Sequence, residues 1–240
     1  MSLQTTACGT PAPPLSPRAR KLAKKRLARE ELRRAAPPPL YSHHTALFKH
    51  LSCDLLQTEL GSQLRQESIV GASGESIPER RLTAWQSDSG ASFRYSGKVM
   101  TGPPLSPRLA EVRDALHARF GVHFDSVLIN LYASGESCMG WHSDPQGDDW
   151  AQETAVVSVG STRKFGFRSA ASPADATQRR DFTLHSGDVI WMGGECQKLL
   201  QHALFATEAR EGEEAVEPAP RISLVYKRRV VAEEGDVEDE

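Results

Sequence analysis

Residues Asn130–Trp150 read NLYASGESCMGWHSDPQGDDW and contain His142-Ser143-Asp144, which places an imidazole and a carboxylate two positions apart. On an extended strand both side chains would point to the same face, because strand side chains alternate with a period of two. A His-any-Asp pair is common by chance. Its meaning therefore depends on what the flanking sequence supplies.

The sequence that follows Gly121 predicts an antiparallel β-structure. Short apolar or alternating runs are separated there by Gly, Ser, Asp and Pro, a pattern typical of a β-sandwich or jelly-roll barrel. The runs are residues 127–132, 156–159, 164–167, 182–184, 189–192 and 222–226, with a polar loop at 169–180.

Two helices are expected before these strands. Leucines recur at three- and four-residue steps between residues 41 and 67, which predicts an amphipathic helix. Pro107–Phe120 predicts a second helix, with Ser106 as its N-cap and Gly121 after its end. Residues 81–100 read as short strands or a structured loop. We therefore expect an α+β fold in which N-terminal helices buttress the β-core.

The two ends of the chain differ from its centre in composition. Residues 1–40 are rich in proline and carry the basic run Arg18–Arg34, whereas residues 231–240 are acidic. We expect a disordered arm and a mobile tail that flank one domain at 41–230. The arm fits a nuclear localisation patch, a nucleic-acid-binding arm, an organelle transit peptide or a plain solvated tail. We expect a nuclear protein, with chloroplast or mitochondrion as the alternative.

Cysteine usage and hydropathy exclude several classes of protein. The four cysteines are scattered and contain no CxxC pair, which argues against a zinc ribbon and against a disulfide scaffold. No apolar run approaches the length of a membrane span, so we expect no membrane partner.

The chain offers a third ligand for a metal. A redox iron site needs two histidines and one carboxylate on one face of the ion, with the other face open. His142 and Asp144 supply two of these, and His185 and His202 are candidates for the third. His185 lies in a turn-like LHSGD segment. His202 follows the next strand and its loop, so that a barrel could fold it onto the first pair, and we favour it.

The segment RISLVYKRR (Arg221–Arg229) offers an anchor for a dicarboxylic cosubstrate. On a strand, Arg221, Ser223 and Lys227 share a face, while Arg228 points the other way. The planar guanidinium of Arg221 could bind a carboxylate through two parallel hydrogen bonds.

Taken together, these residues resemble the AlkB family of Fe(II)- and 2-oxoglutarate-dependent dioxygenases. The segments that carry the resemblance, in order, are RLTAW (81–85), FRYSG (93–97), NLY (130–132), WHSD (141–144), VVSVGSTRKFGFR (156–168), HSGDVIWMGG (185–194), His202 and RISLVYK (221–227). Each is a weak signal alone, and their common order makes a strong one.

The resemblance implies a double-stranded β-helix (jelly-roll) core with a nucleotide-recognition lid, and it implies roles for individual residues. The iron ligands would be His142, Asp144 and His202. The 2-oxoglutarate site would be formed by Asn130, Tyr132, Arg221, Ser223 and Lys227, with Arg221 on the distal carboxylate. Trp85 and Tyr95 in the lid would contact or stack on a flipped base.

The implied reaction is the oxidative removal of N-alkyl groups from DNA or RNA bases, as in alkylation repair or RNA demethylation. O2 and 2-oxoglutarate would be consumed, and formaldehyde, succinate and carbon dioxide released. The substrate would be single-stranded or flipped from a duplex, and we expect a monomer. Two alternatives stay open: the same chemistry on a protein or small molecule, and a catalytically weak nucleic-acid-binding member.

Two positions depart from the family pattern. Lys227 stands where a second arginine is usual, which predicts weakened cosubstrate binding or a repacked site because lysine lacks the planar fork. Pro145 and Gln146 follow Asp144, where repair members tend to carry another acidic residue near the base. Asp148 or Asp149 could substitute for it.

Overall fold

The computed structural model of the chain describes residues 24, 39–71, 73–145, 149–207 and 219–230. The chain divides into two units, residues 1–38 and 39–240, and the strands named below all belong to the second. The expected arm, apart from Lys24, Pro39 and Leu40, and the whole expected tail lie outside the described residues.

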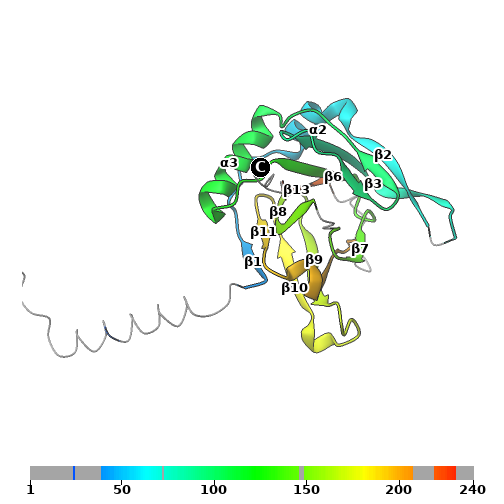
Figure 1. The fold of residues 1–240 in the computed structure, drawn as a ribbon, viewed down its shortest axis with the longest axis vertical. Helices are drawn as coiled ribbons and strands as arrows, with labels where there is room; N and C mark the ends of the chain where they lie inside the picture. Colours follow the sequence, from blue (N-terminus) through cyan, green and yellow to red (C-terminus); the bar gives the residue numbers. More distant parts are fainter. Residues whose placement is uncertain (1–23, 25–38, 72, 146–148, 208–218, 231–240) are drawn as a thin grey trace, which may run out of the picture. The chain divides into compact units, whose positions relative to one another are not determined.

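Two antiparallel sheets form the body of this second unit (Figure 1). The larger sheet has seven strands, which in spatial order are β1 (Tyr41–His44), β11 (Val189–Met192), β8 (Trp150–Gly160), β13 (Arg221–Arg229), β6 (Ser126–Tyr132), β3 (Ser76–Ser87) and β2 (Arg65–Val70). The smaller sheet has four, β10 (Arg180–Leu184), β9 (Arg163–Ser169), β12 (Leu200–Leu204) and β7 (Met139–His142). A separate hairpin pairs β4 (Phe93–Tyr95) with β5 (Lys98–Met100). The architecture is the expected jelly-roll.

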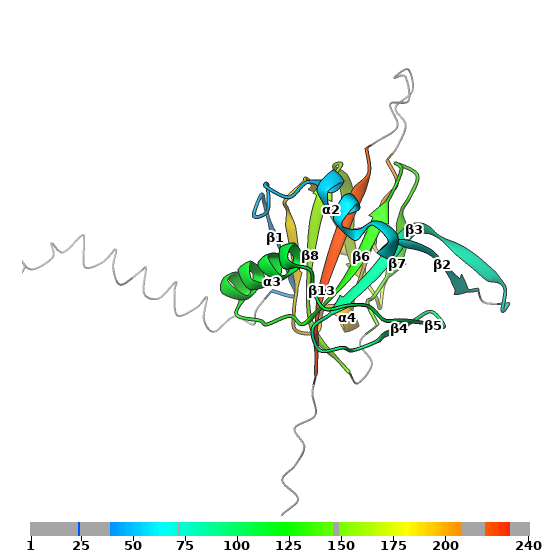
Figure 2. The same cartoon turned by 90° about the horizontal axis from the view of Figure 1, so that it is seen from above.

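The central strands β6, β8 and β13 of the larger sheet are buried on both faces over most of their length. On β6, Val127 and Ile129 pack with the helices α2 (Cys53–Leu60) and α3 (Pro107–Phe120) (Figure 2). The alternate residue Leu128 packs instead with side chains of the smaller sheet. The same alternation on β8 and β13 leaves their second face directed at the interior, where the candidate site lies.

The expected helix over residues 41–67 is wrong at both ends. The α-helix covers only Cys53–Leu60, because β1 pairs with β11 and β2 pairs with β3, and a 3-10 turn follows it at Gly61–Gln63. Leu56 and Leu60 are buried, but Leu47 and Leu55 are 38% and 53% exposed. Backbone pairing with distant strands therefore overrides the local leucine periodicity.

The second expected helix is confirmed. It begins at Pro107 and ends before Gly121, whose φ of 73° places it in the left-handed region and whose N–H bonds the carbonyl of His117. Ser106 occupies the N-cap position, but its hydroxyl makes no capping hydrogen bond. The short helix α4 (Cys196–Leu199) precedes β12. No helix of the described residues is long and apolar enough to cross a membrane.

Candidate active site

A cavity opens between the two sheets and is lined by many of the residues that the sequence predicts to be functional. Its polar lining consists of Arg81, Tyr95, Asn130, Tyr132, His142, Asp144, His202, Arg221 and Ser223. Its apolar lining consists of Phe93, Leu128, Met139, Pro145, Val156, Phe165, Leu204 and Val225. Nearly all the residues expected to hold iron, cosubstrate and base therefore surround one space.

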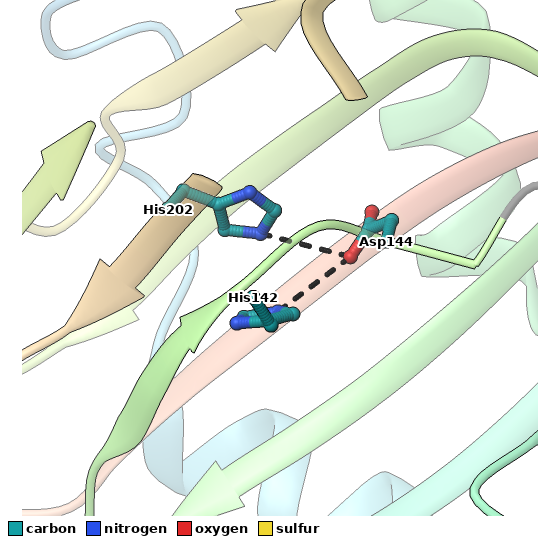
Figure 3. Close-up of side chains that lie close together, drawn as sticks. All are labelled: His142, Asp144 and His202. Atoms are coloured by element: carbon teal, nitrogen blue, oxygen red, sulfur yellow. Dashed lines mark ion pairs between the residues drawn. The ribbon is translucent and has the colours of Figure 1, made fainter. Parts of the chain in front are cut away.

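Two histidines and one aspartate converge at this cavity (Figure 3). His142 ends β7 and lies opposite His202 on β12 in the ladder of the smaller sheet, so that their rings are 4.3 Å apart. The Asp144 Oδ1 atom lies 3.7 Å from the Nε2 atom of His142 and 3.6 Å from that of His202. One ligand atom from each residue lies within 4.8 Å of the others, as a shared metal ion requires.

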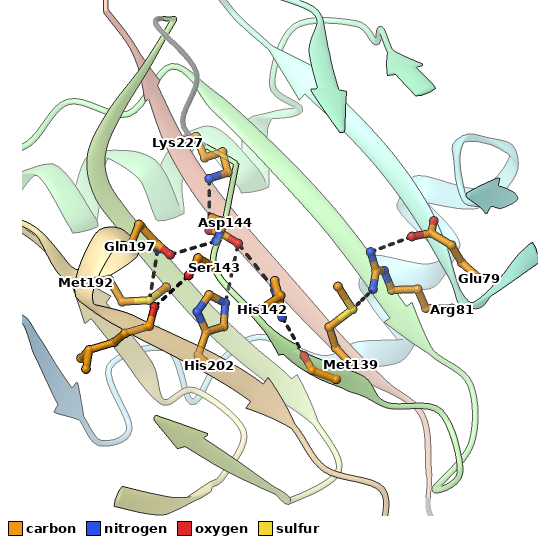
Figure 4. A network of polar contacts seen from close by, with 12 residues as sticks. Glu79, Arg81, Met139, His142, Ser143, Asp144, Met192, Gln197, His202 and Lys227 are labelled. Atoms are coloured by element: carbon orange, nitrogen blue, oxygen red, sulfur yellow. Dashed lines mark hydrogen bonds and ion pairs between the residues drawn. The ribbon is translucent and has the colours of Figure 1, made fainter. Parts of the chain in front are cut away.

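Contacts behind the ligands hold their orientation (Figure 4). The Nδ1 atom of His142 lies 2.8 Å from the carbonyl oxygen of Gly140, which leaves Nε2 directed at Asp144. The backbone N–H of Asp144 donates to the Gln197 side chain at 2.9 Å, and the Ser143 hydroxyl donates to the Leu200 carbonyl at 2.9 Å. The segment after β7 is thereby tied to α4 and β12.

The charges at this site favour the protonation states that bind a metal. Burial would raise the pKa of Asp144, but the electrostatic influence of Lys227 and of the two histidines outweighs it and holds this pKa well below its usual range. Burial lowers the pKa of His202 to about 3, and the neighbouring His142 and Lys227 act in the same direction. Near pH 7 the carboxylate is therefore ionised and the His202 imidazole neutral.

This donor set fits Fe(II). Two imidazole nitrogens and one carboxylate oxygen on one side, with a cavity on the other, form the arrangement that leaves coordination positions open. The structure brings together His142, Asp144 and His202, as the sequence indicated. His185 lies elsewhere, in the turn before β11, where its Nδ1 is 3.1 Å from the Thr162 hydroxyl.

Arg221 supplies a buried positive charge at another point of the cavity wall. It is 1% exposed, and burial lowers its pKa only to about 10, so the guanidinium stays charged. One of its nitrogens donates to the Ser158 hydroxyl at 2.8 Å, while Nε has no hydrogen-bond partner. No carboxylate of the described residues pairs with it. A ligand carboxylate would supply that partner, which fits 2-oxoglutarate.

The other residues expected to hold the cosubstrate lie beside Arg221. The Tyr132 ring centroid is 5.4 Å from the Arg221 guanidinium carbon, and Ser223 pairs with Asn130 across β13 and β6. The Oδ1 atom of Asn130 is buried without a hydrogen-bond partner and is available to a ligand.

Lys227 faces the interior but contacts the metal site. Its Nζ lies 3.1 Å from Asp144 Oδ2, and Lys227 is 2% exposed. Arg228 points to the opposite face, where it pairs with Glu153 at 3.4 Å. The alternation expected for β13 is therefore correct. A direct contact of Lys227 with the cosubstrate stays a prediction.

The two expected lid aromatics occupy different places. Tyr95 lines the cavity, whereas Trp85 is 2% exposed and stacks on Phe93, with ring centroids 5.0 Å apart. The Trp85 indole N–H donates to the carbonyl of Ala91. Phe93 thus stands between Trp85 and the cavity, and within residues 81–100 the aromatic residues that line the cavity are Phe93 and Tyr95. Both belong to the FRYSG segment, where residues two apart on a strand share a face.

Sequence reasoning missed the carboxylate of Glu79. It is buried beside the cavity and accepts from Arg81 at 2.8 Å and from Lys98, while the Tyr95 hydroxyl lies 3.4 Å away. The spacing of Glu79 and Arg81 places both on one face of β3, but no local motif reveals that Lys98 joins them, because that contact depends on the approach of β5 to β3. Of the acidic residues proposed to act near the base, Asp148 lies outside the described residues, and Asp149 is exposed.

The chain is similar to proteins that share this site chemistry. The family model of the 2OG-Fe(II) oxygenase superfamily matches residues 41–227. Protein R406 of Acanthamoeba polyphaga mimivirus is 35% identical over 185 residues, which is 76% of this chain and 91% of that protein. The DNA oxidative demethylase ALKBH2 of Bos taurus is 27% identical over 198 residues, covering 77% of this chain and 67% of ALKBH2.

Two further relatives extend the match. The alpha-ketoglutarate-dependent dioxygenase alkB homolog 3 of Bos taurus is 29% identical over 154 residues, which cover 61% of this chain and 51% of the relative. The solved structure of OsALKBH1 superposes with a TM-score of 0.56 at 16% identity, covering 80% of this chain and 98% of that one. At that identity the superposition shows the fold alone.

Proposed function

The chain belongs to the AlkB family within the 2OG-Fe(II) oxygenase superfamily, and from this premise we propose that it oxidatively removes N-alkyl groups from nucleic-acid bases. Its cofactors are those of the superfamily: Fe(II), 2-oxoglutarate and O2. The observation that carries the proposal is the opening of the His-Asp-His group onto an apolar cavity with Phe93 and Tyr95 in its wall. Two of its relatives are named as DNA demethylase and alkB homolog.

Each part of the cavity has one task in this reaction. His142, Asp144 and His202 would hold Fe(II), which supplies the oxidation of the alkyl carbon when 2-oxoglutarate and O2 are present. Arg221 would bind the distal carboxylate of 2-oxoglutarate, and Asn130 would complete that site through its unpartnered Oδ1. Lys227 holds Asp144 in place through its ion pair.

The overall reaction balances without another reagent. One oxygen atom of O2 converts the N–CH3 group to N–CH2OH, which breaks its C–N bond to release formaldehyde and the N–H base. The second oxygen atom enters the cosubstrate, which loses carbon dioxide and becomes succinate. The apolar lining excludes water from the alkyl carbon, and Tyr95 is placed to hold the base.

The form of the substrate follows from the depth of the site. The metal ligands lie in the interior between two sheets, so a base inside a stacked duplex cannot reach them. We propose a single-stranded or flipped base as the substrate and a monomeric enzyme. In this proposal the basic run Arg18–Arg34 adds salt-dependent affinity and directs the protein to the nucleus. If deletion of residues 1–38 left the salt dependence of the nucleic-acid binding constant unchanged, the arm would not contribute to binding.

The test is mass spectrometry of a panel of methylated DNA and RNA oligonucleotides after anaerobic loading with Fe(II). Wild-type protein should release formaldehyde and succinate in equal amounts and lower the mass of a substrate by that of one CH2 unit, because N–CH3 becomes N–H. His142→Ala should do neither. Turnover of a peptide or metabolite with no oligonucleotide converted would favour the same chemistry on another substrate. An iron-containing protein that forms no succinate would favour a catalytically weak binding protein.

A further inference from the structure

Negative charge is scarce around the cavity among the residues that the structure describes. Among the described lining residues, Asp144 is the only carboxylate, and it faces the two histidines and Lys227. A base that carries a positive charge needs a carboxylate or another electron-rich partner to offset its loss of water. Asp144 cannot serve as this partner while it ligates a metal.

Lysine ammonium groups already lie near the two aromatic rings that the β4 strand contributes to the cavity. The Lys98 ammonium lies 4.3 Å from the Tyr95 ring centroid, and the Lys227 ammonium lies 5.5 Å from that of Phe93. Aromatic faces attract cations through their negative quadrupole, and this is how they would hold a positively charged base. In this cavity the rings of Tyr95 and Phe93 already attract lysine ammonium groups instead of a base.

The rim of the cavity carries an excess of positive charge. Glu79 is the one carboxylate in a cluster with Arg81 and Lys98, which leaves one uncompensated cation where β3 meets the β4–β5 hairpin. Figure 4 shows Arg81 between Glu79 and Met139, apart from Lys227. Arg81 itself lines the cavity. The repulsion on an incoming cation is weakly screened there, because Glu79 and Arg81 are buried and Lys98 is partly buried.

We propose that the cavity selects alkylated bases that carry no positive charge. The two negative charges of the cosubstrate would offset the two positive charges of Fe(II), and Lys227 offsets Asp144. The positive charge of Arg221 and the net positive charge of the rim cluster are then left without a negative counterpart. The inference rests on the proposed demethylation of nucleic acid and names the class of base within it. The base would be neutral, such as an N-alkylated thymine, uracil or guanine, and the charged N-alkyl adenines and cytosines would be poor substrates.

The test compares 3-methylthymine with 3-methylcytosine at the same position of one single-stranded oligonucleotide. Both are pyrimidines methylated at N3, and 3-methylthymine also has a C5 methyl, but only 3-methylcytosine is cationic near pH 7. We expect kcat/KM to be roughly tenfold or more higher for 3-methylthymine. The affinity of the metal-free protein, measured by fluorescence anisotropy, should differ in the same direction. A preference for 3-methylcytosine in both measurements would overturn the inference and leave the proposed function standing.

A matched pair of variants tests whether the rim cluster is responsible. Lys98→Gln and Arg94→Gln each remove one positive charge from the same hairpin, but Arg94 is exposed and Lys98 contacts Tyr95 and Glu79. Lys98→Gln should lower the 3-methylthymine to 3-methylcytosine ratio by roughly fivefold to tenfold, and Arg94→Gln should leave it unchanged. Equal shifts in both variants would contradict the assignment to the rim. Conversion of neither base by any variant would refute the proposed function and the inference with it.

Discussion

Two segments of the chain have nearly the same sequence, but one contributes to the candidate metal site and the other to the structure of the fold. His142-Ser143-Asp144 directs its carboxylate between two imidazole nitrogens at 3.6 and 3.7 Å. His185-Ser186-Gly187-Asp188 directs its carboxylate at the backbone N–H groups of Ala46, at 2.8 Å, and His185, at 3.0 Å. Asp188 also lies 2.9 Å from the Nε2 atom of His43.

The distances separate a functional carboxylate from a structural one. At 2.8 to 3.0 Å the oxygens of Asp188 are engaged in hydrogen bonds that fasten β1 and the turn before β11. At 3.6 to 3.7 Å the histidines are too far from Asp144 for a hydrogen bond, and an ion has room between them. The extra residue of the second segment, Gly187, makes the turn: its φ is 87°, and a Cβ would meet the backbone of Phe48 at 2.7 Å.

The largest expected effect is on catalysis. Asp144→Asn should lower succinate formation roughly 1000-fold or more, because the ligand set loses its only carboxylate. Asp188→Asn should retain most activity at a temperature where it is folded, since Asp188 does not line the cavity. Succinate release under saturating Fe(II) and 2-oxoglutarate measures both. Comparable losses in two folded variants would abolish the distinction drawn between the carboxylates.

The next effect concerns the two arginines of β13. Arg221→Gln should raise KM for 2-oxoglutarate roughly 100-fold, because a buried guanidinium can pair with a carboxylate through two hydrogen bonds. Arg228→Gln removes the same charge from the same strand but on its outer face, and KM should change less than twofold. Initial rates over a range of 2-oxoglutarate concentrations give both values. An equal rise in KM would show that overall charge, and not the inward position, binds the cosubstrate.

The sequence could predict the metal end of the cavity because its residues lie on regular strands. Alternation places Arg221 and Ser223 on one face, and the chain order of His142, Asp144 and His202 resembles a known family. The rim could not be predicted in this way. Glu79 and Arg81 share one face of β3, but Lys98 meets them only because the hairpin β4–β5 approaches β3, and nothing in the local spacing indicates that contact. The sequence predicts that Trp85 contacts the nucleic-acid base, but Phe93 of the β4–β5 hairpin stacks on it and covers it.

The helix expected over residues 41–67 shows that local sequence also fails to predict long-range strand pairing in the fold. Leucine spacing indicates a helical face, but it carries no information about a partner strand. Tyr41–His44 and Arg65–Val70 are strands because β11 and β3 offer them backbone hydrogen bonds. Their own side chains are largely polar, so local propensity does not mark them as strands.

A smaller effect is expected on stability. Burial would raise the pKa of Asp188, but the N–H groups of His185 and Ala46, together with His43, lower it below its usual value. The resulting stabilisation is present above the ordinary pKa, near pH 4, and is lost as the pH falls through the folded-state pKa. Asp188→Asn should therefore cost about 2 kcal/mol of unfolding free energy at pH 7.

The pH dependence of that cost provides the check. In urea unfolding of the metal-free protein, the difference between wild type and Asp188→Asn should shrink as the pH falls from about 4 towards 2. Asp181→Asn, which removes a carboxylate from an exposed pair with Arg179, serves as the control and should cost less than about 0.5 kcal/mol. A difference that is constant with pH would mean that the charge of Asp188 does not stabilise the fold.

The smallest effect is expected at Lys227. This ammonium reaches Asp144 Oδ2 as a single contact, whereas a guanidinium could keep that contact and direct a second donor elsewhere. Lys227→Arg should therefore raise the affinity for 2-oxoglutarate several-fold, roughly threefold to tenfold. Isothermal titration of the Fe(II)-loaded protein under anaerobic conditions measures it. An unchanged affinity would show that Lys227 does not weaken the cosubstrate site.

The central claim is that the first of the two similar segments, and not the second, forms the iron site with His202. Its most direct test is the iron content of gel-filtered protein after anaerobic titration with Fe(II), in wild type, His202→Ala and His185→Ala. We predict one Fe(II) per chain in wild type and in His185→Ala, and almost none in His202→Ala. Full iron retention by His202→Ala, or its loss from His185→Ala, would contradict the site.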